Sequence, residues 1–164
     1  MDHPKVNLTV SVDTGSSEGV NSRFESVNAV FNKINIAVAR GSEDGTELLA
    51  EKIANMQRQF LAVGGHILTG ELYNSISSEG GGLSYTIGST LGEDEYSPSV
   101  IEYGRGPVYP IHCQFLHYFN MRTNEEVFSR YSKPYEGDPY VAPSAEFGEQ
   151  IAQETLMDSI RGWL

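Results

Sequence analysis

The sequence predicts an α+β fold, in which a small, mostly antiparallel sheet is packed by one long helix and a C-terminal helix. Short runs that alternate apolar and polar residues recur along the chain, and such alternation is typical of half-buried strands. Two longer segments, 44–63 and 142–163, instead repeat apolar residues every three or four positions. That spacing is the period of an amphipathic helix.

Residues 1–41 are predicted to form a β-rich extension or hairpin, ahead of a main domain over 42–164. The alternating runs 6–12 and 34–38 are the candidate strands, and turn-forming residues occupy 13–19 between them. A short element over 27–31 would fill the remaining connection. The N-terminal region is therefore expected to pair with itself.

The first helix is predicted to begin near Asp44, which would act as its N-cap with Glu47 as the capping-box partner. Gly64 and Gly65 would end it, because glycine is favoured just past a helix. The apolar side chains share one stripe, which we expect to face the core or else a partner helix. This stripe consists of Leu49, Ile53, Met56, Phe60 and Val63.

A second, short helix is predicted over 69–76, with Thr69 as its cap. The glycine-rich segment 78–82 would form a flexible break before an alternating strand over 83–88. Pro98 disfavours a regular strand over 96–104, so a turn running into a short helix is expected there.

The aromatic-rich part of the chain is predicted to form two strands, 115–119 and 127–131, followed by a loop over 133–139. The final helix would then open at Ala142, with Pro143 in the tolerated first turn.

The final helix carries apolar residues on two faces. Phe147 and Ile151 lie nearly opposite the larger stripe. A helix that is apolar on two sides must be covered on two sides, and one cover could be a neighbouring subunit. The larger stripe consists of Ala145, Ala152, Leu156, Ile160 and Trp163.

The composition limits the class of protein. The 164 residues include 22 Asp and Glu against 11 Lys and Arg, a formal charge of −11. This excess argues against tight nucleic-acid binding and against anionic membrane surfaces, which both require clustered positive charge. The single cysteine, Cys113, excludes an intramolecular disulfide. The sequence begins without a signal-peptide pattern or a membrane-spanning run, so we expect synthesis in a cytoplasm.

Three residues that can ligate zinc, His112, Cys113 and His117, lie close together in sequence. They support one alternative function, a small metal-dependent or hydrolytic enzyme. The segment is predicted to be a strand rather than a helix, so His112 would lie on the opposite face from Cys113 and His117, and no second cluster supplies further ligands. We therefore interpret them as two surface histidines and a small buried thiol, and we predict no catalytic residue, metal or cofactor.

Residues 66–145 carry a series of motifs in a characteristic order. The segment T-G-E-L-Y-N-S-I at 69–76 is followed by T-I-G-S at 86–89 and Y-S-P-S-V-I-E-Y-G at 96–104. A proline-bearing stretch at 108–110, F-L-H-Y-F at 115–119 and D-P-Y-V-A-P-S-A at 138–145 complete the series. In this order the motifs resemble the head–tail joining proteins of long-tailed phages, also called neck, tail-completion or minor tail proteins.

The resemblance implies a structural virion protein rather than an enzyme. Members of that family form oligomeric rings around the DNA channel, between the head connector and the tail. The expected partners are copies of the chain itself and other neck or tail proteins, namely the connector or head-closure protein, the tail terminator and the tail tube. An acidic ring would let genomic DNA pass without tight binding, since like charges repel. A monomeric adaptor or binding module remains the other alternative.

The candidate motif and interface residues share a position in these motifs or on the final helix. They are Thr69, Gly70, Leu72, Ile76, Val100, Glu102, Tyr103, Gly104, Pro139, Tyr140, Pro143, Phe147, Leu156 and Trp163. Most are expected to define the fold. Glu102 is the polar exception, and we expect it to pair with Arg105 or with a neighbouring subunit.

Overall fold

The computed structural model describes residues 18–67, 69–91, 97–120 and 122–164. The predicted α+β class is confirmed, with the difference that the strands form two separate antiparallel pairs, β1–β2 and β3–β4. The elements in chain order are α1 (Glu18–Val63), α2 (Glu71–Ser75), β1 (Ile76–Gly81), β2 (Ser84–Ser89), α3 (Ser97–Tyr103), β3 (Leu116–Asn120), β4 (Glu125–Ser129) and α4 (Val141–Arg161).

Helix α1 is longer than predicted, because it contains 46 residues and extends for about 69 Å. The predicted strand over 34–38 and the short element over 27–31 are wrong, since both lie within this helix. The predicted β-rich extension is therefore helical from residue 18 to 41, and its first strand, 6–12, lies outside the described residues. The reason is that apolar residues at 27, 30, 31, 34 and 38 follow the helical period over a longer window.

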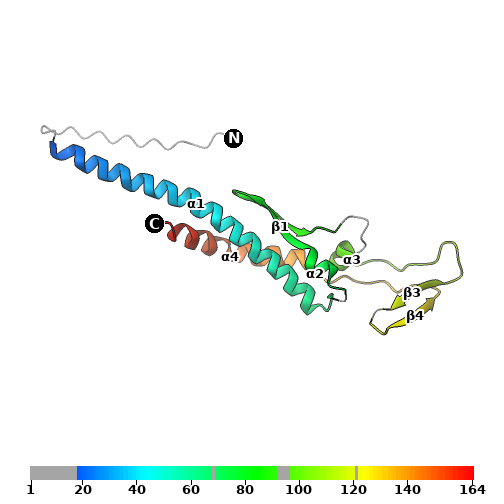
Figure 1. Ribbon diagram of the computed structural model, residues 1–164. Helices are drawn as coiled ribbons and strands as arrows, with labels where there is room; N and C mark the ends of the chain where they lie inside the picture. Colours follow the sequence, from blue (N-terminus) through cyan, green and yellow to red (C-terminus); the bar gives the residue numbers. More distant parts are fainter. Residues whose placement is uncertain (1–17, 68, 92–96, 121) are drawn as a thin grey trace.

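Helices α1 and α4 run antiparallel and approach each other closely at glycines (Figure 1). A Cβ at Gly41 would overlap the Ile160 backbone, and one at Gly148 would overlap the Ile53 side chain. Asp44, the predicted N-cap, lies inside α1, where its carboxylate accepts a hydrogen bond of 2.8 Å from Trp163 Nε1.

The buried faces of these two helices differ from the predicted stripes. Within the predicted helix the buried residues with side chains are Ala50, Ala54, Gln57 and Leu61, each one position after a predicted stripe residue, and Ala37, Gly41 and Gly45 continue the buried face toward the N-terminus of α1. Val63 is 88% exposed, and the other four stripe residues are only partly buried. In α4 the buried residues are Ser144, Gly148 and Thr155. Small residues lie where the two helices approach most closely, at Gly41 and Gly148, and the larger apolar residues of the predicted stripes remain at least partly exposed beside them.

Strands β1 and β2 form a hairpin that packs on α1. The predicted break over 78–82 is wrong, because most of it belongs to β1, while the predicted strand that follows it is confirmed as β2. Ile76 and Ile87 lie on the same face of the hairpin and contribute to the core, as the register places Ile76 opposite Ser89 and Ser78 opposite Ile87.

The predictions for the rest of the chain are confirmed with shifts of a few residues. A short helix, α3, is present with Pro98 in its first turn, and the two aromatic strands pair as β3 and β4. Figure 1 shows this second hairpin projecting away from α1 and α4, on a stalk joined by single bridges at Arg105–Tyr135 and Val108–Ser132. Within the described residues, none of the helices is long and apolar enough to cross a membrane.

Candidate functional site

The motif segments around residues 102 and 140 meet at the N-terminus of α4. The Glu102 carboxylate accepts hydrogen bonds from three consecutive backbone N–H groups, those of Tyr140 (2.8 Å), Val141 (2.9 Å) and Ala142 (3.3 Å). These N–H groups have no partner within their own helix, and the helix dipole favours a negative charge beside them. Glu102 therefore caps α4 from α3.

The predicted pairing of Glu102 with Arg105 is wrong. Arg105 instead donates to Ser132 Oγ at 2.7 Å and to the Gly106 carbonyl at 3.3 Å. The carboxylate is better placed at the helix N-terminus, where three fixed donors converge on it.

Two glycines join the backbones on either side of this cap. Gly104 and Gly137 adopt positive φ angles of 75° and 84°. A Cβ at Gly104 would overlap the Tyr135 carbonyl oxygen. Hydrogen bonds from Arg105 N to Tyr135 O (2.7 Å) and from Asp138 N to Ile101 O (2.6 Å) hold the two segments together. We call the Glu102 cap and these paired segments, 101–105 and 135–142, the junction.

The core lies beneath the junction. The predicted motif residues Leu72, Ile76 and Tyr140 are buried together with Ala54 and Leu61 of α1. Burial, with a smaller contribution from the Glu102 carboxylate, raises the pKa of Tyr140 above its usual 10.0. These three motif residues thus define the fold.

Two motif residues near α2 behave differently from the prediction. Gly70, with a φ of 77°, is the N-cap of this helix rather than Thr69. The Thr69 hydroxyl accepts only a long hydrogen bond of 3.4 Å from the Glu71 N–H.

The remaining candidates are partly or largely exposed. Tyr103 is 82% exposed and Trp163 46% exposed, whereas Val100, Pro143, Phe147 and Leu156 are partly buried and Pro139 is exposed. Pro143 occupies the first turn of α4, as predicted.

A polar cluster that the sequence analysis missed lies beside the junction. His66 Nε2 is 3.0 Å from Asp138 Oδ2, and the His66 ring meets Tyr135 edge to face at 6.5 Å. The Tyr135 hydroxyl is buried without a hydrogen-bond partner among the described residues. Burial and the nearby Asp138 carboxylate raise its pKa. The cluster connects the residues that follow α1 to the segment that precedes α4, and His66 and Asp138 are 72 positions apart in sequence.

The three zinc-ligand candidates do not form a metal site in the part of the chain that the structure describes. The His117 ring stacks on Phe128 at 4.4 Å. Cys113 is exposed and its thiol donates to the Phe115 carbonyl at 3.0 Å, so the prediction of a buried thiol is wrong.

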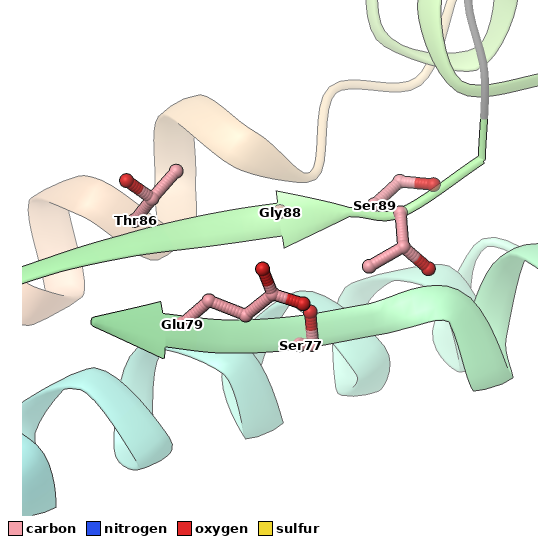
Figure 2. Close-up of a pocket in the computed structure, with 6 residues that line it drawn as sticks. Ser77, Glu79, Thr86, Gly88 and Ser89 are labelled. Carbon is pink, nitrogen blue, oxygen red and sulfur yellow. The ribbon is translucent and has the colours of Figure 1, made fainter.

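The outer face of the β1–β2 hairpin carries a polar hollow of about 410 Å³ (Figure 2). Ser77, Glu79 and Thr86 line it from the face opposite Ile76 and Ile87. The hollow has hydroxyl groups and one carboxylate but no cation among its lining residues, so it lacks a group that would fix an anionic substrate.

Large apolar side chains are exposed mainly at the two projecting ends of the molecule. One end is the part of α1 that passes and then extends beyond the C-terminal end of the chain, which we call the α1 tip, with Val27, Val30, Phe31, Ile34 and Val38 each at least 40% exposed. The other is the β3–β4 hairpin with its stalk, which exposes Tyr109, Ile111, Phe115, Tyr118, Phe119, Phe128 and Tyr131. Figure 1 places these two regions at opposite ends. They cannot cover each other within one chain.

The charge is distributed unevenly between these ends and the body. Residues 18–40 contain three Lys and Arg against two Glu, and residues 104–137 contain four against three Glu. The remaining residues from 41 onward hold 15 acidic residues against three basic ones. The two projecting ends are therefore nearly neutral as well as apolar, whereas the body is strongly acidic.

The fold and the junction define a small α+β protein with two apolar projections on an acidic body. Comparison of the chain with family models, with curated proteins and with solved structures finds no match.

Proposed function

We propose that this chain is a structural protein of the phage neck or tail, one subunit of an oligomeric ring that joins the head connector to the tail around the DNA channel. The observation that carries the proposal is the pair of apolar, nearly neutral ends on an acidic body. Contiguous exposed apolar surface marks sites of protein association. Two different surfaces on one chain favour head-to-tail contacts, which close into a ring when the rotation permits.

The order of the motifs is a second support. Glu102, Gly104, Leu72, Ile76 and Tyr140, which belong to three of the motifs, meet at one junction and its core, as residues that specify a common fold would. This convergence is independent of the charge distribution.

The acidic body suits a channel through which DNA must move. Fifteen acidic residues against three basic ones would repel phosphates at distances within the Debye length, about 10 Å at 0.1 M salt. The proposed role requires passage of DNA rather than its retention.

The alternatives make different demands on the chain. An enzyme built on His112, Cys113 and His117 would need these side chains to converge, and His117 is stacked on Phe128 instead. A monomeric adaptor would use one apolar surface, which leaves the second projecting end without an explanation.

The decisive experiment is deletion of the gene from the phage that encodes it. We expect DNA-filled heads and separate tails in electron micrographs of the lysate, and complementation from a plasmid should restore joined particles. Mass spectrometry of purified wild-type particles should detect the chain. Normal joined particles after deletion would overturn the proposal.

A further inference from the structure

The first half of helix α1 carries a seven-residue repeat. Its apolar residues alternate at spacings of four and three, at positions 20, 24, 27, 31, 34 and 38, and an asparagine follows the first of each pair, at 21, 28 and 35. This spacing places the six apolar positions on one stripe of a helix and is the pattern of a coiled coil. We call these six positions the heptad stripe.

Helix α4 covers the continuation of the heptad stripe but leaves the stripe itself exposed. The same spacing continues to Gly41 and Gly45, where a Cβ at either position would lie 3.0 Å or less from an atom of α4. The stripe residues whose side chains the structure describes are each 40–48% exposed, namely Val27, Phe31, Ile34 and Val38. The described part of the chain therefore offers no cover for this apolar surface.

The heptad stripe also lies in a segment that forms a helix poorly on its own. Fourteen of the 19 residues from 20 to 38 are Val, Ile, Phe, Asn or Ser. These residues have a lower helix propensity than Ala, Leu, Glu or Lys. A helix in a protein gains most of its stability from the packing of its apolar face. We therefore expect this part of α1 to require a partner along the heptad stripe.

The heptad stripe is complementary to a second copy of itself that runs in the opposite direction. Its spacings, 4-3-4-3-4, read the same from either end, about a centre at residue 29. In an antiparallel pair, Phe31 of each copy would face Val27 of the other, and Ile34 would face position 24, which is also a phenylalanine. Each of these layers combines a large side chain with a smaller one, as a well-packed interface requires. A parallel pair would instead place phenylalanine on phenylalanine and valine on valine, so that crowded layers alternate with underfilled ones.

The asparagines favour the same orientation. They follow one edge of the heptad stripe, and a two-fold axis across the helices brings this edge of one copy against the same edge of the other. Asn28 would then lie beside Asn28 of the second copy, and Asn35 beside position 21. An amide side chain both donates and accepts hydrogen bonds, so two asparagines can pair with each other.

The charges also favour an antiparallel pair. Residues 18–40 contain three Lys and Arg against two Glu, so two α1 tips repel each other little, whereas the body holds 15 acidic residues against three basic ones. An antiparallel pair keeps the two bodies at opposite ends, and a parallel pair would hold them side by side. Like charges repel over roughly the Debye length, about 10 Å at 0.1 M salt, so the separation of the bodies is favourable.

We propose that two copies of this chain pair through their α1 tips as an antiparallel two-stranded coiled coil, with the heptad stripes as its core and a two-fold axis near residue 29. The pair goes beyond the proposed function and does not rest on it. In a ring all copies point the same way, so the antiparallel pair is a state of the free chain and must open before a ring forms. Until then it covers the apolar surface of the α1 tip.

Self-association of the full chain, measured by analytical ultracentrifugation, tests the core of the pair. Phe31→Ala removes a side chain that occurs twice in the pair, so we expect it to weaken the dimer about tenfold to a hundredfold. Alanine is the better helix former, so the variant should not lower the helical content of dilute protein in circular dichroism. Ile36→Ala, on the opposite side of the helix and 57% exposed, is the matched control and should leave the dimer unchanged. A wild type that stays monomeric, or equal effects of the two variants, would overturn the pair.

A second pair of variants tests the asparagine edge. Asn28→Lys places two ammonium groups beside each other at the two-fold axis and should weaken the dimer severalfold, since like charges repel. Asn32→Lys adds the same charge away from the heptad stripe and should have little effect. If both lysines weaken the dimer equally, the asparagine edge does not lie at the contact and the proposed register is wrong.

Spin-label distances test the orientation without altering the contact. In a Cys113→Ser background, a nitroxide is attached at Glu43→Cys, a position on α1 beyond the heptad stripe. In the antiparallel pair each label lies 14 residues from the two-fold axis, so the two labels are about 42 Å apart along the helices at a rise of about 1.5 Å per residue. In a parallel pair they would lie within about 20 Å, or two helix diameters. A double electron–electron resonance distance centred near 42 Å supports the proposal, and one centred near 20 Å contradicts it.

The outcomes separate this pair from the proposed function. If gene deletion blocks head–tail joining but Phe31→Ala leaves self-association unchanged, the function stands and the pair fails. If deletion has no effect, the function fails, and the pair is still decided by the ultracentrifugation and the spin-label distance.

Discussion

The junction and the two projecting ends use the same kinds of residue in opposite ways. At the junction, the polar and aromatic groups find their partners within the chain. Glu102 accepts three backbone hydrogen bonds, and Tyr140 is buried in the core. At the ends, valines, isoleucines and tyrosines stay exposed on one helix and one hairpin. The buried motif residues therefore specify the fold, while the exposed apolar residues gather on the α1 tip and on the β3–β4 hairpin with its stalk.

This difference explains why several of the predicted interface residues cannot contact a partner. Leu72, Ile76 and Tyr140 are buried in the core of a single chain and are not available to a partner. The α1 tip, in contrast, belongs to the region that was predicted as a β-rich extension. Variants of the two regions test this difference, because junction variants should destabilise the monomer and variants of the projecting ends should not.

The largest effect is expected for Gly104→Ala. The new Cβ would combine a left-handed backbone conformation with an overlap of the Tyr135 carbonyl oxygen. We expect a loss of about 3 kcal/mol in the free energy of unfolding, measured by urea denaturation. Gly106→Ala is the matched control, because a Cβ at this position meets nothing within 4 Å. Equal losses in both variants would contradict the role of the backbone contact at Gly104.

A smaller loss is expected for Glu102→Ala, which removes the acceptor of three α4 N–H groups. The unfolding free energy should fall by about 2 kcal/mol, in line with the loss of a charged helix cap. Glu146→Ala, an exposed change in the same helix, should stay within about 0.5 kcal/mol of the wild type. If the two variants unfold at the same urea concentration, Glu102 does not hold the junction.

Local patterns in the sequence predicted most of the elements. The glycine stop after residue 63, the two aromatic strands and the proline in the first turn of α4 are each determined within a few residues. The N-terminal half of α1 was missed because five alternating residues at 34–38 fit a strand, and the helical period becomes evident only over a longer window.

Tertiary contacts explain the other errors. Hydrophobic periodicity selected large residues for the helix contacts, whereas Gly41 and Gly148 mark the places where the backbones approach closely. The His66–Asp138 pair and the Glu102 cap join positions at least 38 apart, so no local pattern could have identified them. Gly104 and Gly137 were a local signal of unusual backbone at these two positions, because glycine is favoured where φ is positive.

Raising the pH should weaken the junction through Tyr140. Its pKa is raised in the folded state, so folding favours the neutral phenol. The corresponding stability is complete below pH 10, the pKa of an exposed tyrosine, and is lost as the pH rises toward the folded-state value. Urea denaturation from pH 8 to 11 should show a smaller decline for Tyr140→Phe than for the wild type. Parallel declines would indicate that Tyr140 does not ionise with unfolding.

The smallest effect on monomer stability is expected at the α1 tip. Val30→Gln and Ile34→Gln together replace residues that are 58% and 40% exposed, and glutamine is a good helix former. The unfolding free energy of dilute protein should therefore change by less than about 0.5 kcal/mol. Ile36→Gln, on the opposite side of the same helix and 57% exposed, is the matched control. If the α1 tip contacts a neighbour, the paired variant should weaken self-association while Ile36→Gln does not. If the paired variant and Ile36→Gln weaken self-association equally, Val30 and Ile34 do not contact a neighbour. A large loss of monomer stability in the paired variant would instead show that the α1 tip, like the junction, stabilises the fold.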